Sequence, residues 1–582
     1  MKLASVEKGV PQPEICYFFF RSEQKAMAST HAAAYRSILA QILHMRQHDD
    51  HLLDKIAFAM GQGDGQLHAS PSELIELLQL CLQGCDNMVL ILDGVDECQN
   101  AEDLVSDLLR IIAAGSGSLK LIFFSRPNVS KLSSSVPEEY RVTMNKTAVS
   151  KDIETYLLRR IEELSEDGLL PRNSDCARLV RHLTCGADGM FLWAHLMITY
   201  LHSAVLTPMS RTKTILSVTM PEGLDKMYCR ILGFIQRSTK AQRDLAKRVF
   251  TWLLFARRNL QCRELQQAII ADESRSLYDD RDEICEFRKA VLMACAGLVE
   301  SSTAKEAGPE NCTLQFVHLT VKEFLTTPSM NAQNSPTMPT DSQALIPSPF
   351  IGQIQLAKCC LHFLNVSMPA KPLSGRLDQR TTTPSLDWSF PFLTYAAVSW
   401  IGHLRETMEM NVVEEYSMHK HEADQSLSEL CIVLTQFISQ NLVVMAWIET
   451  LYTTRENGWS DFSDLKDWAS WATGTLLPKS DLKILQLLND LQDLAKDLSS
   501  LDDQWQDKLK LRPNAIWSET TVFTPSRFWT TSTAMTLTSL VPTHANEASL
   551  SSRFLRMISC TSLDGTTVGV LSVWSSRYSD TS

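Results

Sequence analysis

The 582-residue sequence lacks several motifs that would each define a function. It has no GxxxxGK[ST] loop for nucleotide phosphates and no GxSxG elbow, and none of its 15 cysteines forms a CxxC pair. The N-terminus has no apolar core of signal-peptide length. The longest apolar segments, Met190–Leu206 and Leu427–Ile448, contain polar residues that suit buried helices better than a membrane span. These absences predict reduced thiols in a cytoplasmic protein without a membrane span.

The sequence also has fewer basic than acidic residues. Lys and Arg number 55 against 67 Asp and Glu, which gives a formal charge of −12. A protein built to hold nucleic acid needs a basic face, so we expect no nucleic-acid partner. The hydrophobic share of 44% and the charged share of 21% are ordinary for a globular chain. No internal repeat of about 33 to 45 residues is found.

Short apolar runs alternate with amphipathic segments over the first 145 residues. The runs are Ile15–Phe20, Met88–Leu92, Leu119–Phe124 and Tyr140–Met144. The amphipathic segments are 29–60, Pro71–Leu82 and Ala101–Ala113. This alternation predicts one parallel sheet with all four runs as strands, covered by helices and buried on both faces.

Polar residues follow two of these runs. Asp93, Asp96 and Glu97 follow MVLIL, and Ser125 and Arg126 follow LKLIFF. Parallel sheets bind ligands at the carboxyl ends of their strands. Acids after an apolar run are the pattern of a Walker B strand, in which the first acid holds Mg²⁺ and the later acids orient an attacking water. An arginine beyond the next strand can contact a terminal phosphate. The alternative is that the acids only cap the following helix.

The sequence resembles fungal NACHT-type signalling ATPases of the STAND class, which have a nephrocystin-like NTPase domain. The segments that carry the resemblance occur in the family's order: ICYFFF, MVLILDGVDEC, LKLIFFSRP, DIETYLLRRIEEL, GADGMFLWAHLMITYL, PEGLDKMYCRIL, FTWLLFARRNLQCRELQQAI and LQFVHLTVKEFL. The resemblance implies an α/β P-loop-NTPase-like parallel sheet, followed by mainly α-helical domains that include a winged helix similar to that of GPI inositol-deacylase relatives. It also implies ATP or ADP with Mg²⁺ as cofactors, and protein partners that include further copies of the chain.

The resemblance assigns roles to individual residues. Asp93 would bind Mg²⁺, Asp96 and Glu97 would support hydrolysis, and Ser125 with Arg126 would contact phosphate. In the family a winged-helix histidine touches the β-phosphate of ADP and locks the closed state, and His318 in FVHLTVKEF matches that segment. The alternative is a packed or capping histidine at a strand-to-helix junction. Glu264 and Glu286 are among the acidic residues that argue against DNA binding by this winged helix.

The chain departs from the family at the P-loop. In the family this loop and its strand precede the ICYFFF-like strand, whereas only 14 residues precede Ile15 here, and none fits. Either Met1 is a misplaced start and the chain is a fragment, or the chain is a variant that has lost the loop that binds the nucleotide phosphates. We expect weak ATP binding by this chain, with ATPase activity only in a longer form. A non-catalytic scaffold with a degenerate nucleotide site is the alternative to a signalling switch. The missing strand should leave a gap or force Leu119–Phe124 against Tyr140–Met144, and the unpaired backbone of these two strands should be open to aggregation.

The domain boundaries follow from composition and from the resemblance. We predict a truncated NTPase core at 1–145, a small helical domain at 146–235, a winged helix at 236–326, a linker rich in Pro, Ser and Thr at 327–350, a helical domain at 351–510 and a β-rich tail at 511–582 that could begin a repeat or propeller region.

Several secondary-structure elements are predicted within these later domains. In the winged helix, Ala246–Ala256, Arg263–Ile270 and Leu319–Leu325 are predicted as helices, and Cys295–Ser301 and Leu314–His318 as strands. Apolar residues spaced 3-4 from Ile484 to Trp505 would suit a two- or three-stranded coiled coil, but Leu485 and Leu488 widen the apolar face, so packing within the chain is predicted instead. The VGVLSVW run at 568–574 predicts a strand in the tail.

Overall fold

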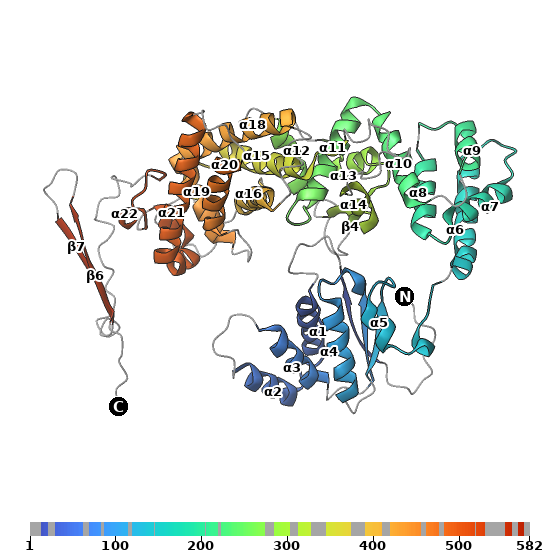
Figure 1. The fold of residues 1–582 in the computed structure, drawn as a ribbon, viewed down its shortest axis with the longest axis horizontal. Helices are drawn as coiled ribbons and strands as arrows, with labels where there is room; N and C mark the ends of the chain where they lie inside the picture. Colours follow the sequence, from blue (N-terminus) through green and yellow to red (C-terminus); the bar gives the residue numbers. More distant parts are fainter. Residues whose placement is uncertain are drawn as a thin grey trace. The chain divides into compact units, whose positions relative to one another are not determined.

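The computed structural model is predominantly helical, with a three-stranded parallel sheet near the N-terminus and two antiparallel strand pairs (Figure 1). It divides into two compact units, Met1–Leu356 with Glu409–Ser426, and Ala357–Met408 with Leu427–Ser582. The structure describes residues 13–20, 30–61, 69–82, 87–114, 119–144, 146–203, 205–218, 223–273, 284–302, 312–326, 345–373, 390–409, 420–454, 461–475, 482–517, 520–529, 553–561 and 568–575.

The parallel sheet contains the first three predicted apolar runs. Its strands are β1 (Glu14–Phe19), β2 (Met88–Asp93) and β3 (Lys120–Phe124), in the order β1-β2-β3. Both neighbouring pairs are parallel, with Phe19 opposite Asp93 and Asp93 opposite Phe124. The carboxyl ends of all three strands therefore lie at one edge of the sheet.

Helices bury one face of this sheet. Alternate residues of β2, namely Met88, Leu90 and Leu92, are fully buried. They belong to a hydrophobic core shared with α1 (His31–Met45), α3 (Pro71–Leu82) and α4 (Ala101–Ala114), and Figure 1 shows α1 and α4 beside the sheet. A further helix, α2 (Asp50–Gly61), lies between α1 and α3 in the sequence. Each helix uses its apolar stripe for this contact.

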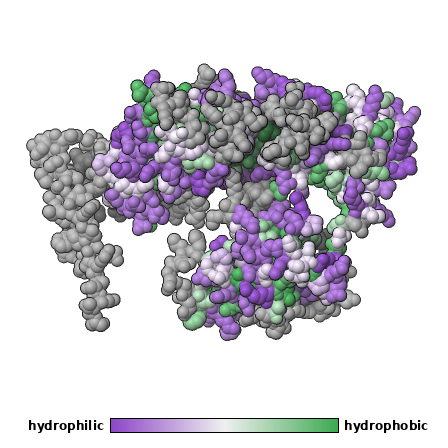
Figure 2. All heavy atoms as spheres, viewed as in Figure 1, coloured by the Kyte–Doolittle hydropathy of each residue, from purple (hydrophilic) through white to green (hydrophobic). Residues whose placement is uncertain are grey.

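The opposite face of the sheet is partly exposed, which corrects the prediction of strands buried on both faces. Ile15, Tyr17 and Phe19 of β1 are 37%, 53% and 53% exposed, and Ile122 and Phe124 of β3 are 41% and 55% exposed. Hydrophobic residues also reach the surface of the unit in Figure 2. The apolar runs have the composition of doubly covered strands, but the described helices cover only the face toward α1 and α4.

The two edges of the sheet differ. On the outer edge of β1, the backbone N–H of Tyr17 donates to Gln41 Oε1 at 3.1 Å, and Gln41 Nε2 donates to the carbonyl of Tyr17 at 2.8 Å. Arg46 of the same helix region binds the Glu14 carboxylate at 3.0 Å. On the outer edge of β3, no described residue pairs with the backbone of Lys120–Phe124. Among the described residues, the outer edge of β1 is therefore partly covered by a side chain, whereas the outer edge of β3 is unpaired.

The prediction of a fourth strand at Tyr140–Met144 is wrong. Its first residue, Tyr140, ends a short 3-10 helix, η2 (Glu138–Tyr140), and the other four residues form no ladder. Tyr140, Val142 and Met144 are 73%, 89% and 78% exposed. The alternation of apolar residues suits a strand, but a strand also needs a neighbour for its backbone groups, and no described residue supplies one.

Helices make up most of the chain that follows the sheet in the first unit. They are α5 (Ser130–Ser135), α6 (Lys146–Glu166), α7 (Cys176–Ala187), α8 (Phe191–Leu201), α9 (Pro208–Leu216), α10 (Leu224–Gln236), α11 (Lys240–Phe255), α12 (Cys262–Glu273), α13 (Phe287–Ala294) and α14 (Leu319–Thr326).

The wing consists of β4 (Val299–Ser302) and β5 (Thr313–Phe316), which pair antiparallel. The predicted strand at Cys295–Ser301 therefore begins late. Ala296 and Gly297 have φ angles of 48° and 89°, so the backbone turns there before it extends. The predicted helix at Leu319–Leu325 is confirmed as α14.

The second unit is built mainly from helices. They are α15 (Pro349–Ser367), which begins in the first unit, α16 (Leu393–Met408), α18 (Lys420–Ser439), α19 (Asn441–Thr454), α20 (Phe462–Thr475), α21 (Leu482–Leu511), the 3-10 helix η5 (Pro513–Trp517) and α22 (Thr520–Phe523). The predicted strand in the tail is confirmed as β7 (Val568–Ser575), paired antiparallel with β6 (Arg553–Thr561). Most of the predicted linker, 327–344, lies outside the described residues.

The leucine pattern of α21 packs within the chain, as predicted. Leu487, Leu491, Leu494, Leu498 and Leu501 are buried, and α21 packs against α20. Within the described ranges no single helix is long and apolar enough to cross a membrane; α18 and α19 pass that test only as a pair bent by 90°.

We expect Gln41→Ala to open the outer edge of β1. Loss of both amide contacts should speed hydrogen exchange of the Tyr17 amide about tenfold, since one hydrogen bond contributes about 0.5–1.5 kcal/mol. Hydrogen exchange followed by mass spectrometry measures this directly, with Gln47→Ala, an exposed glutamine just past α1, as the matched control. Equal exchange of Tyr17 in both variants would contradict the assigned edge contact.

Candidate functional site

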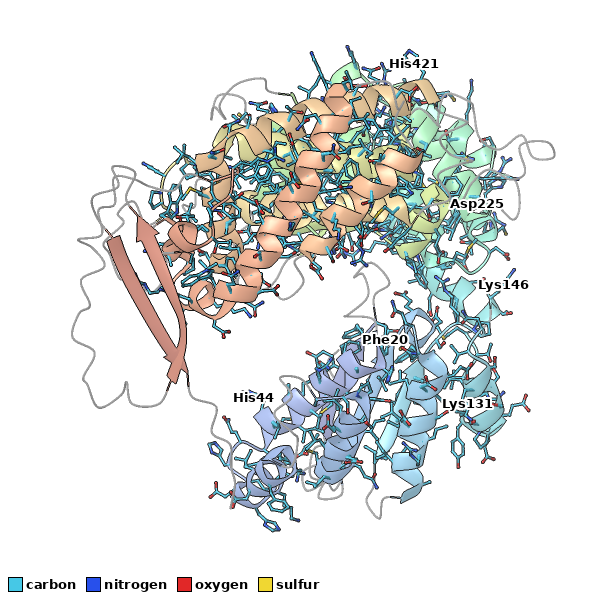
Figure 3. All side chains as sticks on the ribbon, turned by 60° about the vertical axis from the view of Figure 1, so that its left-hand side comes forward. Phe20, His44, Lys131, Lys146, Asp225 and His421 are labelled. Carbon is cyan, nitrogen blue, oxygen red and sulfur yellow. The ribbon has the colours of Figure 1, made fainter. Side chains whose placement is uncertain are left out.

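The carboxyl edge of the sheet begins with a tight turn after β2. Asp93 is the last residue of β2 and its side chain is exposed. Gly94 follows with φ 72° and ψ 35°, and a Cβ placed there would lie 3.1 Å from the carbonyl oxygen of Phe20. Phe20, labelled in Figure 3, directly follows β1 and donates its backbone N–H to the carbonyl of Asp93 at 2.9 Å. Glycine is thus required by both conformation and space.

Asp96 and Arg126 join the loops that follow β2 and β3. The backbone N–H of Arg126 donates to Asp96 Oδ1 at 3.0 Å, and Arg126 Nε lies 3.5 Å from Asp96 Oδ2. The Asp96 side chain is only 8% exposed, whereas that of Arg126 is 45% exposed. Asp96 therefore fixes the backbone of the second loop and leaves part of the guanidinium at the surface.

The other predicted residues of these loops lie at the same edge. Glu97 ends the 3-10 helix η1 (Val95–Glu97), where its backbone N–H donates to the carbonyl of Gly94 at 2.8 Å. The Ser125 hydroxyl donates to the carbonyl of Arg126 at 2.9 Å. Within the described ranges, no group of three or more His, Cys, Asp or Glu residues could hold a metal ion. Any Mg²⁺ here would be held by one exposed carboxylate, with water or ligand oxygens completing its shell.

The winged helix contributes two side chains to the surroundings of Arg126. Glu323 Oε1 of α14 lies 3.8 Å from Arg126 Nη1, and both side chains are about half exposed. The His318 ring is influenced by the charges of Arg126, Glu97 and Glu323. Removal of water by the surrounding protein, followed by the positive charge of Arg126, lowers the pKa of His318, although part of the ring reaches solvent. His318 is therefore mainly neutral at neutral pH.

Contacts of His318 were not apparent from the sequence. The backbone N–H of Thr320 donates to His318 Nδ1 at 3.2 Å, and Thr320 Oγ1 lies 2.8 Å from the same nitrogen. The Tyr228 hydroxyl of α10 lies 2.7 Å from Thr320 Oγ1. The only local signal was the position of Thr320 two residues after His318, which is typical of a hydroxyl near a helix start. Neither Tyr228 nor Glu323 had a signal of its own.

Comparison with known protein families defines the class that this arrangement resembles. Residues 4–126 match the family model described as Nephrocystin 3, N-terminal. Residues 235–335 match the model described as GPI inositol-deacylase, winged helix domain. The sheet with its carboxyl-edge residues falls in the first match and His318 in the second. Together the two matches confirm the predicted resemblance to a nephrocystin-like domain followed by a GPI inositol-deacylase-like winged helix.

Two curated fungal proteins are similar to this chain. The vegetative incompatibility protein HET-E-1 of Podospora anserina is 24% identical over 433 residues, which cover 69% of this chain and 29% of that protein. The azaphilone pigments biosynthesis cluster protein L of Monascus ruber is 26% identical over 191 residues, which cover 33% of this chain and 37% of that protein. The matched regions thus cover less than two fifths of the length of either relative, and the first relative supports a NACHT-like signalling family.

We expect Gly94→Ala to destabilise the carboxyl edge by about 1–2 kcal/mol, the cost of a left-handed backbone for a residue with a Cβ. The new methyl group would also press on the Phe20 carbonyl. The measurement is hydrogen exchange of the β2 amides. The control is Gly233→Ala in α10, where a Cβ meets nothing within 4 Å and alanine favours the helix. The assigned role of Gly94 would be wrong if both variants exchanged alike.

Proposed function

We propose that the chain is part of a NACHT/STAND-type signalling switch in which a nucleotide controls the contact between the carboxyl edge of the sheet and the winged helix. The observation that carries this proposal is the meeting of Asp96, Arg126 and Glu323 at one place, with His318 beside them. Two of these residues come from the loops of the sheet and two from the winged helix. A ligand bound at this edge would act on both parts.

The chemistry of the residues supports an anionic ligand with Mg²⁺. We infer that Asp93 would hold the metal ion, because its exposed carboxylate has no partner among the described side chains. Asp96 and Glu97 would support hydrolysis, and Arg126 with Ser125 would contact phosphate. His318 would donate a hydrogen bond to a phosphate of the diphosphate form. Bound Mg²⁺ would neutralise phosphate charge at this edge.

The ion pair between Arg126 and Glu323 suggests how the switch would change state. Glu323 places a carboxylate where Arg126 can also meet a terminal phosphate, so the two anions would compete for one guanidinium. The pair is half exposed, and such pairs contribute only about 0–1 kcal/mol. A phosphate could displace Glu323 at little cost, after which the winged helix would lose this contact with the sheet. Release of the winged helix would expose surfaces for protein partners, including further copies of the chain.

We also propose that the sheet is of the P-loop NTPase type and takes a further strand beside β3. The support is the edge of β3, which no described residue pairs with, together with exposed Ile122 and Phe124 beside it. A strand there, followed by a helix over the exposed face, would bring a phosphate-binding loop to the carboxyl edge. The absence of GxxxxGK[ST] from all 582 residues favours the alternative, a non-catalytic scaffold, for the chain as it stands.

Nucleotide titration of two proteins tests this proposal. We expect the 582-residue chain to bind ATP weakly. An N-terminal extension that supplies a strand and a GxxxxGK[ST] loop should make binding Mg²⁺-dependent and at least tenfold tighter. In the extended protein, Asp93→Ala should remove the Mg²⁺ dependence, whereas Glu102→Ala, an exposed acid at the start of α4, should not. Binding of ATP at micromolar concentration by the unextended chain would show instead that its own residues form a phosphate-binding loop.

A further inference from the structure

One ring nitrogen of His318, Nδ1, contacts Thr320 at the start of α14, the helix that follows His318. Nδ1 accepts the backbone N–H of Thr320 at 3.2 Å and lies 2.8 Å from Thr320 Oγ1. A backbone N–H can only donate, so Nδ1 must present its lone pair. In a neutral imidazole the single proton then sits on Nε2. This nitrogen has no partner among the residues that the structure describes.

The hydroxyl of Thr320 is itself held by a second helix. Tyr228 of α10 places its hydroxyl 2.7 Å from Thr320 Oγ1, and its ring packs on Phe324 of α14 with centroids 5.1 Å apart. Tyr228 is 1% exposed, and burial raises the pKa of its phenol, so it stays protonated. The consistent direction of donation runs from Tyr228 to Thr320 Oγ1, and from Thr320 to His318 Nδ1. A protonated Nδ1 would oppose both donors of Thr320.

We propose that Tyr228 and Thr320 are positioning residues that fix His318 as its Nε2–H tautomer. The ring then offers a hydrogen-bond donor at Nε2, and Arg126, Glu97 and Glu323 are charged groups that act on this ring. This inference rests on the proposed nucleotide switch for its consequence, namely that Nε2 donates to a phosphate oxygen. The positioning itself does not need a nucleotide to be observed.

The contacts from Tyr228 to Thr320 and from Thr320 to His318 also link two helices of the first unit, α10 and α14. Tyr228 and Thr320 are 92 residues apart, and the contact between their hydroxyls connects α10 to the turn that contains His318. Movement of α14 away from α10 would break the hydrogen bond between Tyr228 and Thr320, while the Thr320 hydroxyl would stay beside Nδ1. The Thr320 hydroxyl would then lose the donor that orients its proton toward Nδ1.

The first test is a pH titration of the 582-residue protein labelled with ¹⁵N-histidine. The His318 signals are assigned by their loss in His318→Asn. The wild type should show the Nε2–H form, and Tyr228→Phe and Thr320→Val should raise the titration midpoint of His318 by about 0.4–1 unit, because each removes support for an unprotonated Nδ1. Thr320→Ser, which restores the hydroxyl, should titrate as the wild type does.

The control is Tyr200→Phe, a buried tyrosine of α8 whose ring packs on Phe234 and which should leave His318 unchanged. A merely structural role for Tyr228 would lower thermal stability in Tyr228→Phe without moving the His318 midpoint. That result, or an Nδ1–H form in the wild type, would overturn the proposal.

ADP affinity of the extended protein separates the two ideas. If His318→Asn, Tyr228→Phe and Thr320→Val each weaken ADP binding about five- to tenfold while Thr320→Ser does not, the positioning role holds for nucleotide as well. If His318→Asn weakens binding but Tyr228→Phe and Thr320→Val do not, the inference is wrong and the switch stands. If no variant changes ADP binding although the midpoints move, the positioning holds and the nucleotide role of His318 is wrong.

Discussion

The pairing of Asp96 with Arg126 is the contact on which the rest of the site depends. Two parallel strands end side by side, and one carboxylate then binds both the backbone and the guanidinium of the following loop. Because Asp96 is nearly buried, this contact resists screening by salt. It leaves Asp93 exposed at the strand end and holds Arg126 within reach of Glu323.

The sheet itself is asymmetric, and its asymmetry has a physical meaning. One face is sealed by α1, α3 and α4, and the outer edge of β1 is closed by the Gln41 amide. The other face exposes aromatic and branched side chains, and the edge of β3 is open in the described part of the chain. Apolar side chains on an exposed face cost free energy in water, at roughly 25 cal/mol per Å². The proposed strand beside β3, with a helix above the face, would cover both features.

Local sequence patterns were enough to predict the strands of the parallel sheet. The apolar runs correctly predicted β1, β2 and β3 because parallel strands are continuously apolar, and the acids after MVLIL follow β2 at the carboxyl edge of the sheet. The same reasoning failed at Tyr140–Met144, since an apolar alternation does not show whether a partner strand exists. It also failed at the start of β4, where Ala296 takes a left-handed conformation that only a tight turn explains.

Contacts between distant residues could not be predicted. Tyr228 reaches Thr320 across 92 residues, and Glu323 reaches Arg126 across nearly 200. Neither pair has a sequence pattern, because hydroxyls and surface acids are common at such positions. The resemblance to the fungal family identified His318 as a candidate. Thr320, which contacts its ring, and Tyr228, which contacts Thr320, could be identified only from the packing of α10 against α14. The chemical roles of Asp93, Asp96, Glu97, Ser125, Arg126 and His318 stay predictions.

The central claim is that the carboxyl edge and the winged helix form one site. Hydrogen exchange of Glu323→Lys tests it most directly, because the new lysine would repel Arg126. The account predicts faster exchange in two separate segments, residues 318–326 and the loop that contains the Arg126 amide. Lys289→Glu, an exposed charge reversal on α13, should change neither. Unchanged exchange at the Arg126 loop in Glu323→Lys would contradict the claim.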